Sequence, residues 1–260
     1  GINAEYGEII MFVVLSQCQQ FYPGKKGKEL RDLLKKDCQK NHKVLGYERA
    51  REEMYGYIYN SKSDQADYCI YTGSRMPCKY ESMSTGCNKQ MNCEHVVPQS
   101  FFNKKNPMVS DLHHLRVAWE GANGGRSNYK FKELDDSLIT QWYGNNFQTK
   151  SAKPVDAEKW SALQKGKAWM PREAAKGDIA RIVAYFFVRY PTEAGPVTST
   201  MASVDDMIEW DDQFPITSLQ KEQYLRVVEV QGNINPFQEE ENLVGRAYCD
   251  LSKNHPCSDY

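Results

Sequence analysis

The sequence predicts an α+β fold that is mainly helical and is cross-linked by disulfides. Residues 177–190 place six large apolar side chains on one broad face at helical spacing, the pattern of a helix packed on a core. Short runs of β-branched and aromatic residues bounded by turn residues, such as residues 68–71, indicate short strands. Eight cysteines are an even number, as a disulfide framework requires. The 260 residues suffice for one large domain, and we expect a single domain over residues 1–260.

An N-terminal helical region is expected over residues 18–67. Apolar and charged residues recur there at three-to-four spacing in residues 30–38 and 47–58, which predicts two helices. A short strand follows at residues 68–71, and a polar loop that carries cysteines continues to residue 92. Disulfides are most useful in such a loop, because it has no core of its own.

The middle of the chain predicts a second short strand and a turn. An apolar patch at Val96 and Val97 ends at Pro98, and residues 111–117 alternate as a strand does. Residues 122–128 form a turn-rich linker that leads into a helix beginning near Ser127. A C-terminal helical region is expected over residues 177–237, with a second helix from Ser218 to Val230.

Charge is balanced overall but unevenly distributed. The chain has 33 basic and 34 acidic side chains, so its formal charge is -1. Residues 89–132 hold seven Lys or Arg against three acids, whereas residues 177–245 hold four against twelve. Such a dipolar chain can present a local positive field to a polyanion.

The longest apolar run, residues 9–15, is far shorter than the roughly 20 residues that a membrane-spanning helix needs. No membrane partner is therefore expected. Because Glu5 and Glu8 stand where a signal peptide carries positive charge, we interpret this run as a buried strand or helix turn.

The cysteines also predict the compartment. Up to four disulfides can form, and disulfides persist in oxidising surroundings, so a secreted or periplasmic location is expected. The chain begins with Gly rather than Met, as expected of a processed or tagged product. The rival interpretation is a zinc site, since Cys87 and Cys93 lie near His95, His113 and His114 in sequence. No C-x-x-C or H-x-x-x-H spacing supports it.

Residues 92–131 carry the chemistry. They contain the segments N-C-E-H-V-V-P-Q-S, S-D-L-H-H-L-R and N-G-G-R-S-N-Y-K-F. Together these segments supply a base to activate water, oxygen ligands for a hard cation, and cations for a phosphate or leaving oxygen. His95 can accept a proton near neutral pH, and the oxygens of Glu94 and Asn128 suit Mg²⁺. Arg126 and Arg116 are close enough in sequence to brace a phosphate.

In this order and spacing the three segments resemble the endonuclease I family of secreted or periplasmic nucleases, whose active site is a ββα-metal (His-Me) finger. Further similar segments are G-K-K-G-K-E-L-R-D-L-L, I-Y-T-G, G-D-I-A-R and E-V-Q-G-N-I-N-P-F. The resemblance covers residues 21–237 and implies a ββα-metal catalytic core over residues 92–132 within the mainly helical domain.

The resemblance implies roles for individual residues. His95 would be the general base, with Glu94 and Asn128 as ligands of Mg²⁺ and with Mn²⁺ or Ca²⁺ as substitute ions. The substrates would be single- and double-stranded DNA and also RNA, bound through phosphates, cut with little sequence preference and left with 5′-phosphates. For the pair His113 and His114, one would orient the site and the other would be structural. Both are also expected to contact substrate, as are Lys104, Lys105 and Asn123. A monomer is expected.

The chain departs from some members of the family, which carry a catalytic arginine between the E-H and D-L-H segments. Residues 96–110 contain no arginine here. The leaving-group stabiliser is therefore Arg126, Arg116 or one of the lysines Lys104 and Lys105. Two other classes of protein remain as alternatives: a disulfide-stapled extracellular binding module without activity, and a structural zinc protein that would unfold on chelation.

Overall fold

The computed structural model describes residues 20–82, 85–87 and 89–260. The predicted element at residues 9–15 and the cysteine Cys18 lie outside the described residues. Helices dominate the described fold, which is α+β as predicted. They are α2 (Gly27–Gln39), α3 (Tyr47–Glu53), α4 (Glu120–Arg126), α5 (Glu173–Arg189), α6 (Val204–Gln213), α7 (Ser218–Gln231) and α8 (Leu243–Tyr248).

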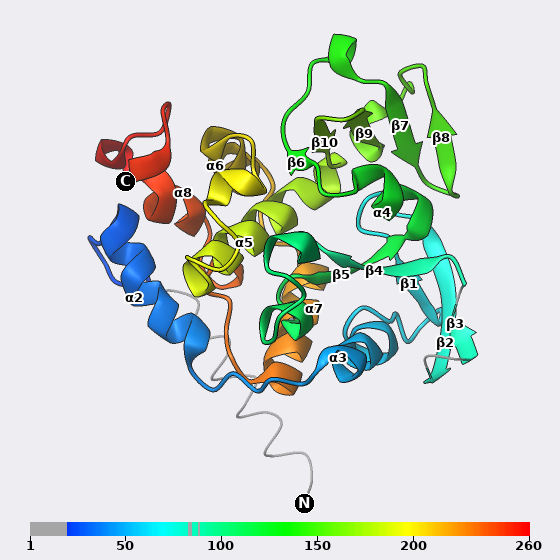
Figure 1. Cartoon of the computed structure of the whole chain (residues 1–260), viewed down its shortest axis with the longest axis horizontal. Helices are drawn as coiled ribbons and strands as arrows, with labels where there is room; N and C mark the ends of the chain where they lie inside the picture. Colours follow the sequence, from blue (N-terminus) through cyan, green and yellow to red (C-terminus); the bar gives the residue numbers. More distant parts are fainter. Residues whose placement is uncertain (1–19, 83–84, 88) are drawn as a thin grey trace, which may run out of the picture.

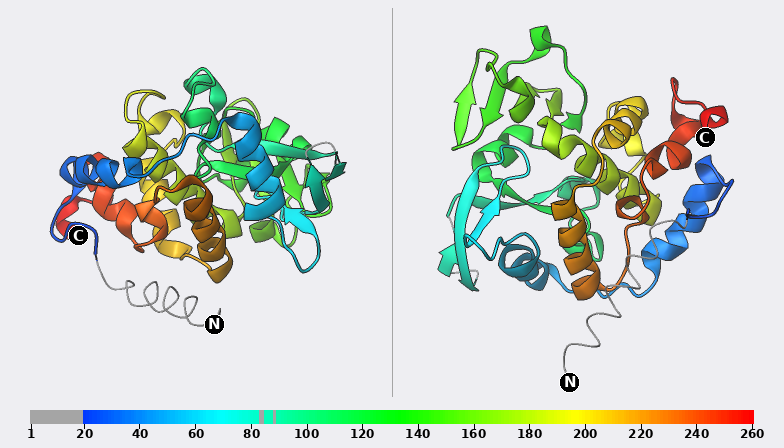
Figure 2. Two further views of the ribbon diagram at one scale, coloured as in Figure 1. Left: turned by 90° about the horizontal axis from the view of Figure 1, so that it is seen from below. Right: turned by 180° about the vertical axis from the view of Figure 1, so that it is seen from behind.

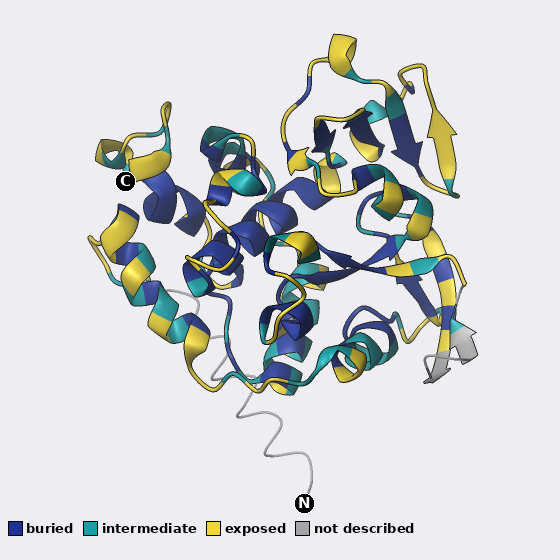
Figure 3. Ribbon diagram, viewed as in Figure 1, coloured by how far each residue is buried: buried dark blue, intermediate teal, exposed yellow. Residues whose placement is uncertain are grey.

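Helix α5 lies at the centre of the molecule, with α2, α6 and α8 grouped to one side of it (Figure 1). Nearly all of its residues from Ala175 to Val188 are buried, which Figure 3 shows as a dark blue helix. A helix that is apolar on most sides is stable only inside a core. The predicted helix at residues 177–190 is therefore confirmed, and it begins one turn earlier.

Local signals set the ends of α7. The Thr217 side chain accepts from the backbone of Gln220, whose side chain accepts from the Thr217 backbone, so the N-terminus has a capping box. Gly232 ends the helix with φ 91°, a left-handed conformation that glycine adopts without strain. A Cβ atom at this position would lie 2.5 Å from the carbonyl oxygen of Asn41. The predicted helix at residues 218–230 is confirmed.

The strands form three separate sheets. Both views of Figure 2 show the strands on the side of the molecule opposite α2 and α8. The first sheet contains β1 (Ala66–Tyr68), β2 (Arg75–Ser82) and β3 (Thr85–Cys87), and the second contains β4 (Met91–His95) and β5 (Leu115–Trp119). The third has the order β6-β10-β9-β7-β8, with β6 (Lys130–Phe131), β7 (Gln141–Gly144), β8 (Gln148–Lys150), β9 (Ser161–Gln164) and β10 (Ala168–Met170).

Several strand predictions are wrong. The loop expected up to residue 92 contains β2 and β3, and the strand expected at residues 111–117 begins only at Leu115. The expected strand at residues 68–71 lies mainly in a turn after β1. No strand was predicted in the third sheet, where Trp142, Trp160 and Ala162 form a small core of their own.

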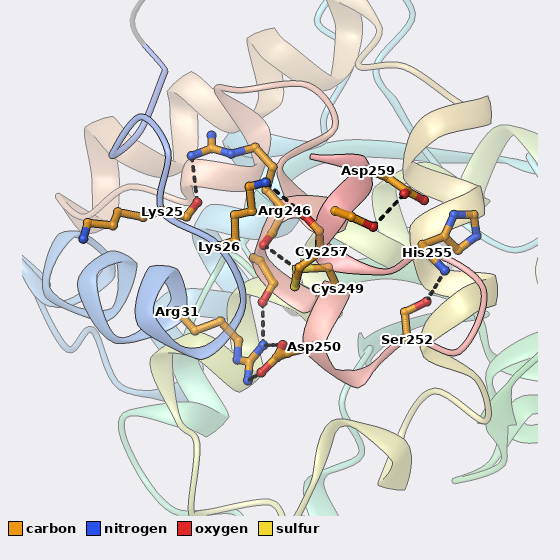
Figure 4. The surroundings of a disulfide bond; sticks show 12 residues. Lys25, Lys26, Arg31, Arg246, Cys249, Asp250, Ser252, His255, Cys257 and Asp259 are labelled. Carbon is orange, nitrogen blue, oxygen red and sulfur yellow. Dashed lines mark hydrogen bonds and ion pairs between the residues drawn. A yellow bond between two sulfur atoms is a disulfide. The ribbon is translucent and has the colours of Figure 1, made fainter.

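Two disulfides form among the described cysteines, Cys78–Cys87 and Cys249–Cys257. Cys38, Cys69 and Cys93 are buried and unpaired, so the eight cysteines do not make four disulfides. The second disulfide closes a C-terminal turn that packs on α2 (Figure 4). There the Lys26 ammonium donates to the carbonyl oxygen of Cys257 at 2.9 Å, and α2 also pairs with Asp250 through Arg31.

Candidate active site

A β-hairpin followed by a short helix carries the predicted site residues. Strands β4 and β5 are antiparallel, with Glu94 opposite Arg116 and His95 opposite Leu115. Helix α4 begins directly after β5 and packs against both strands. The predicted β-β-α order is therefore present, and it places the end of β4 beside α4 (Figure 1).

A cleft of about 350 Å³ opens at this junction. Its walls come from β4 and the segment after it, and from α4 and the turn that follows. The lining residues include Glu94, His95, Asn123, Arg126 and Asn128. Five residues predicted for one site thus meet in one cleft.

One nitrogen of the His95 imidazole forms a hydrogen bond and the other does not. Its Nε2 atom lies 3.0 Å from the carbonyl oxygen of Val109, and since a carbonyl only accepts, Nε2 carries the proton. The Nδ1 atom is buried and has no hydrogen-bond partner among the described residues. The residue is 3% exposed, and this burial, followed by the nearby His114, lowers the pKa of His95 to about 3. His95 is therefore a neutral imidazole whose Nδ1 atom carries no proton.

The Glu94 carboxylate is fixed by two donors from different parts of the chain. The Tyr71 hydroxyl donates to its Oε1 atom at 2.5 Å, and the Arg126 guanidinium donates to the same atom at 3.0 Å. Burial raises the pKa of Glu94, while Arg126 and Tyr71 oppose the rise. Both hydrogen bonds to Glu94 from the described chain end on Oε1, so its Oε2 atom is left for a ligand.

Arg126 holds the two ends of this motif together. Its guanidinium donates to the carbonyl oxygens of His95 at 3.2 Å and Val96 at 2.6 Å, besides pairing with Glu94. The side chain is 1% exposed and lies over the ring of Phe131 at 4.5 Å. This geometry gives Arg126 a positioning role, and its contact with a leaving group stays a prediction.

Two amides line the cleft on either side of the end of α4. The helix ends at Arg126, and Ser127 then turns the chain with φ 52°. The prediction of a helix that begins near Ser127 is therefore wrong. Asn123 lies within the helix, and Asn128 is exposed on the turn that follows.

Arg116 is not part of the cleft, so its predicted catalytic role is wrong. Its Nε and Nη2 atoms donate to the two carboxylate oxygens of Asp178 at 2.8 and 2.9 Å, and both side chains are buried. The guanidinium also lies 5.1 Å from the ring centre of Tyr59. Because an arginine held in this bidentate pair has little freedom to reach a phosphate, Arg116 is structural.

His113 and His114 are buried and do not line the cleft, which corrects their predicted contact with substrate. Their Nε2 atoms lie 3.0 and 2.6 Å from the carbonyl oxygens of Asn233 and Met108. Burial lowers the pKa of each to about 4. The His114 ring lies 5.4 Å from the His95 ring and packs beside it, whereas the His113 ring packs against Tyr185 at 4.7 Å.

Lys104 and Lys105 are exposed on the loop after the 3-10 turn Gln99–Phe101. Gln99 and Ser100 of that turn line the cleft. Neither lysine forms an ion pair with any residue of the described chain. Their predicted contact with phosphate stays a prediction.

The donors in the cleft suit a hard cation. A carboxylate oxygen of Glu94 and the amide oxygens of Asn123 and Asn128 are the ligand types that Mg²⁺ prefers, together with water. Within the described ranges, no group of three or more His, Cys, Asp or Glu is placed to hold a metal ion. Cys87, expected to be free in the zinc interpretation, is bonded to Cys78.

Sequence reasoning assigned no role to Tyr71 or to the Val109 carbonyl group. Tyr71 lies in the segment I-Y-T-G, one of the segments that resemble the family. It is fully buried, and its ring packs against Trp169 at 5.2 Å. The only sequence signal for Tyr71 was its place in a segment that resembles the family. No side-chain pattern in a sequence indicates the position of a backbone carbonyl group such as that of Val109.

An imidazole with an unpartnered nitrogen and a fixed carboxylate, on two residues that line one cleft, are groups that a hydrolytic enzyme site uses. The model of the Endonuclease I family matches residues 25–241, and the chain belongs to this family of nucleases. No helix in the described part of the chain is both long and apolar enough to cross a membrane.

Curated relatives match much of the chain. An extracellular ribonuclease of Bacillus amyloliquefaciens is 26% identical over 233 residues, which are 82% of this chain and 72% of that protein. A periplasmic deoxyribonuclease of Aeromonas hydrophila is 26% identical over 196 residues, 66% of this chain and 75% of that protein. Endonuclease-1 of Buchnera aphidicola is 29% identical over 128 residues, 49% of this chain and 44% of that protein.

Proposed function

We propose that the chain is a secreted or periplasmic, metal-dependent endonuclease that hydrolyses phosphodiester bonds of DNA and RNA and leaves 5′-phosphates. The matched relatives support this, since they include an extracellular ribonuclease and a periplasmic deoxyribonuclease. Little sequence preference is expected, because phosphate contacts carry no sequence information. We expect the enzyme to act as a monomer.

The observation that carries the proposal is that His95, a residue that lines the cleft, has an Nδ1 atom without a hydrogen-bond partner in the described chain. This nitrogen accepts a proton from the attacking water, and a positioned general base contributes roughly 10² to 10⁴ in rate. The Val109 carbonyl oxygen, 3.0 Å from Nε2, holds the ring in orientation and stabilises the imidazolium that forms.

Glu94 and Asn128 are the proposed ligands of Mg²⁺, with Asn123 as a further amide in the same cleft. A bound divalent ion supplies positive charge that neutralises the charge developing on the phosphate oxygens. Tyr71 and Arg126 keep the Glu94 carboxylate in place for this purpose. Such supporting contacts orient a ligand and typically change metal affinity or activity about 10- to 100-fold.

The test joins metal binding with cleavage. Wild type should cut plasmid, single-stranded DNA and RNA with Mg²⁺ and not with EDTA. Glu94→Gln should weaken Mg²⁺ binding in calorimetry by about tenfold or more, because it removes the carboxylate charge. Glu158→Gln is the matched control, since Glu158 is exposed and outside the cleft. Cleavage in EDTA, or equal affinities in the two variants, would overturn the metal assignment, and an inert wild type would favour a binding module.

A further inference from the structure

Three exposed lysines lie at the end of the five-stranded sheet that adjoins the cleft. Asn128 lines the cleft, and Lys130 begins strand β6 two residues further along the chain. Lys165 and Lys167 lie in the turn between β9 and β10. All three side chains are exposed.

The strand register brings these lysines together. Strand β6 is parallel to β10, and Lys130 is paired with Ala168, the residue after Lys167. Ala168 is paired in turn with Gln164, the residue before Lys165. The turn is closed by a hydrogen bond of 3.0 Å from the Lys167 amide to the Gln164 carbonyl oxygen. Since neighbouring strands lie about 4.8 Å apart, the three lysine backbones form one compact group.

These lysines have no acidic partner. In the described part of the chain, none of Lys130, Lys165 and Lys167 forms an ion pair or an ammonium hydrogen bond. Three other lysines of the same region are paired: Lys153 with Asp136, Lys159 with Asp156 and Lys176 with Glu133. Three neighbouring charges are therefore available to an external anion.

We propose that Lys130, Lys165 and Lys167 form a phosphate track that binds the nucleic acid beyond the scissile bond. The inference rests on the proposed function, and it names the surface that holds a long substrate. On the other wall of the cleft, Ser100 lines the cleft and the exposed Lys104 and Lys105 follow it in the chain. Lysine ammonium groups act as point charges without base contacts, so the track binds any sequence.

The track predicts a dependence on substrate length and salt. Replacing all three lysines with glutamine removes about two to three phosphate contacts, so the slope of log affinity against log salt should fall by about 2 to 3 for duplex DNA. The KM for a long substrate should rise about tenfold or more near physiological salt, with kcat unchanged, because the lost contacts are equal in ground and transition states. A dinucleotide confined to the cleft should be cut as by wild type.

The matched control replaces Lys36, Lys40 and Lys43 with glutamine. These lysines are also exposed and free of ion pairs within the described residues, and they lie in and just after α2, far from the five-stranded sheet (Figure 1). The control variant loses the same positive charge as the track variant. Because its lysines lie far from the track, it should keep the wild-type KM and nearly the wild-type salt slope.

The experiment measures binding of a labelled 20-nucleotide strand and duplex in EDTA at several salt concentrations, and then cleavage with Mg²⁺. A larger loss in the track variant than in the control, for long substrates only, supports the track. An active wild type with equal behaviour of the two variants overturns the track and leaves the proposed function intact. A wild type that neither binds nor cuts polynucleotides overturns the proposed function itself.

Discussion

The Nε2 atom of His95 lies 3.0 Å from the carbonyl oxygen of Val109. This contact fixes the tautomer, because only a protonated Nε2 can donate to a carbonyl group. The consequence is a lone pair on Nδ1, which faces no donor among the described residues. A backbone group from the segment between the two strands of the hairpin therefore sets the tautomer of the proposed base.

Removing the Tyr71 hydroxyl should weaken the site without unfolding the protein. Tyr71→Phe deletes the 2.5 Å hydrogen bond to Glu94 and keeps the buried ring. Loss of such a supporting contact should lower kcat/KM and Mg²⁺ affinity by about 10- to 100-fold. Steady-state kinetics and calorimetry measure the two effects. Tyr185→Phe is the control, since Tyr185 donates to the buried carboxylate of Asp111 away from the cleft. Equal losses of activity in both variants would refute the role of Tyr71.

Arg126→Lys separates a positioning role from leaving-group stabilisation. A lysine keeps the charge but cannot span Glu94 and the carbonyl oxygens of His95 and Val96. We expect kcat/KM to fall by about 10- to 100-fold both for DNA and for a p-nitrophenyl phosphodiester, whose leaving group needs no stabilisation. If the loss disappears with the p-nitrophenyl ester, Arg126 contacts the leaving oxygen instead.

Arg116 should matter for stability rather than for cleavage. Arg116→Met leaves the carboxylate of Asp178 buried without its cation, which costs about 3–5 kcal/mol of unfolding free energy. The double variant Arg116→Met, Asp178→Leu removes both charges and should recover much of this loss. Denaturant unfolding measures the stabilities, and the folded fraction of each variant should cut DNA at nearly the wild-type rate. A hundredfold slower but stable variant would restore Arg116 to the catalytic site.

His113 makes the fold sensitive to acid. Its pKa is about 4 in the folded protein, lowered by burial, against about 6.5 in an unfolded chain. Between these values the unfolded chain binds a proton that the folded protein does not, so stability falls as the pH drops from about 6.5 to 4. The share of His113 is on the order of 3 kcal/mol. Unfolding at pH 7 and pH 4.5 should show a smaller pH-dependent loss for His113→Gln than for wild type. Equal losses would contradict the assignment.

The long helices were predictable because their patterns are strong. The apolar face at residues 177–190 and the helical spacing at residues 218–230 correspond to α5 and α7. The five-stranded sheet was not predictable, since its strands have only two to four residues and give no clear alternation. Short strands depend on pairing partners far along the chain, which local patterns do not reveal.

The site was predictable only where its residues are neighbours in the sequence. Glu94 and His95 belong to one segment, so their meeting in the cleft followed from the sequence. Arg116 looked equally suitable, but its partner Asp178 lies 62 residues further along the chain. The place of Asn128 depended on the turn at Ser127, whose positive φ no local pattern indicated.

The most direct test of the account is cleavage by His95→Ala, with His255→Ala as the control and circular dichroism to verify folding. His255 lies near the C-terminus beside Glu209, outside the cleft. Folded His95→Ala should cut plasmid DNA with Mg²⁺ at least about a hundredfold more slowly than wild type, because it lacks the general base. His255→Ala should cut at the wild-type rate. If folded His95→Ala cuts as fast as the control, another group activates the water and the central claim is wrong.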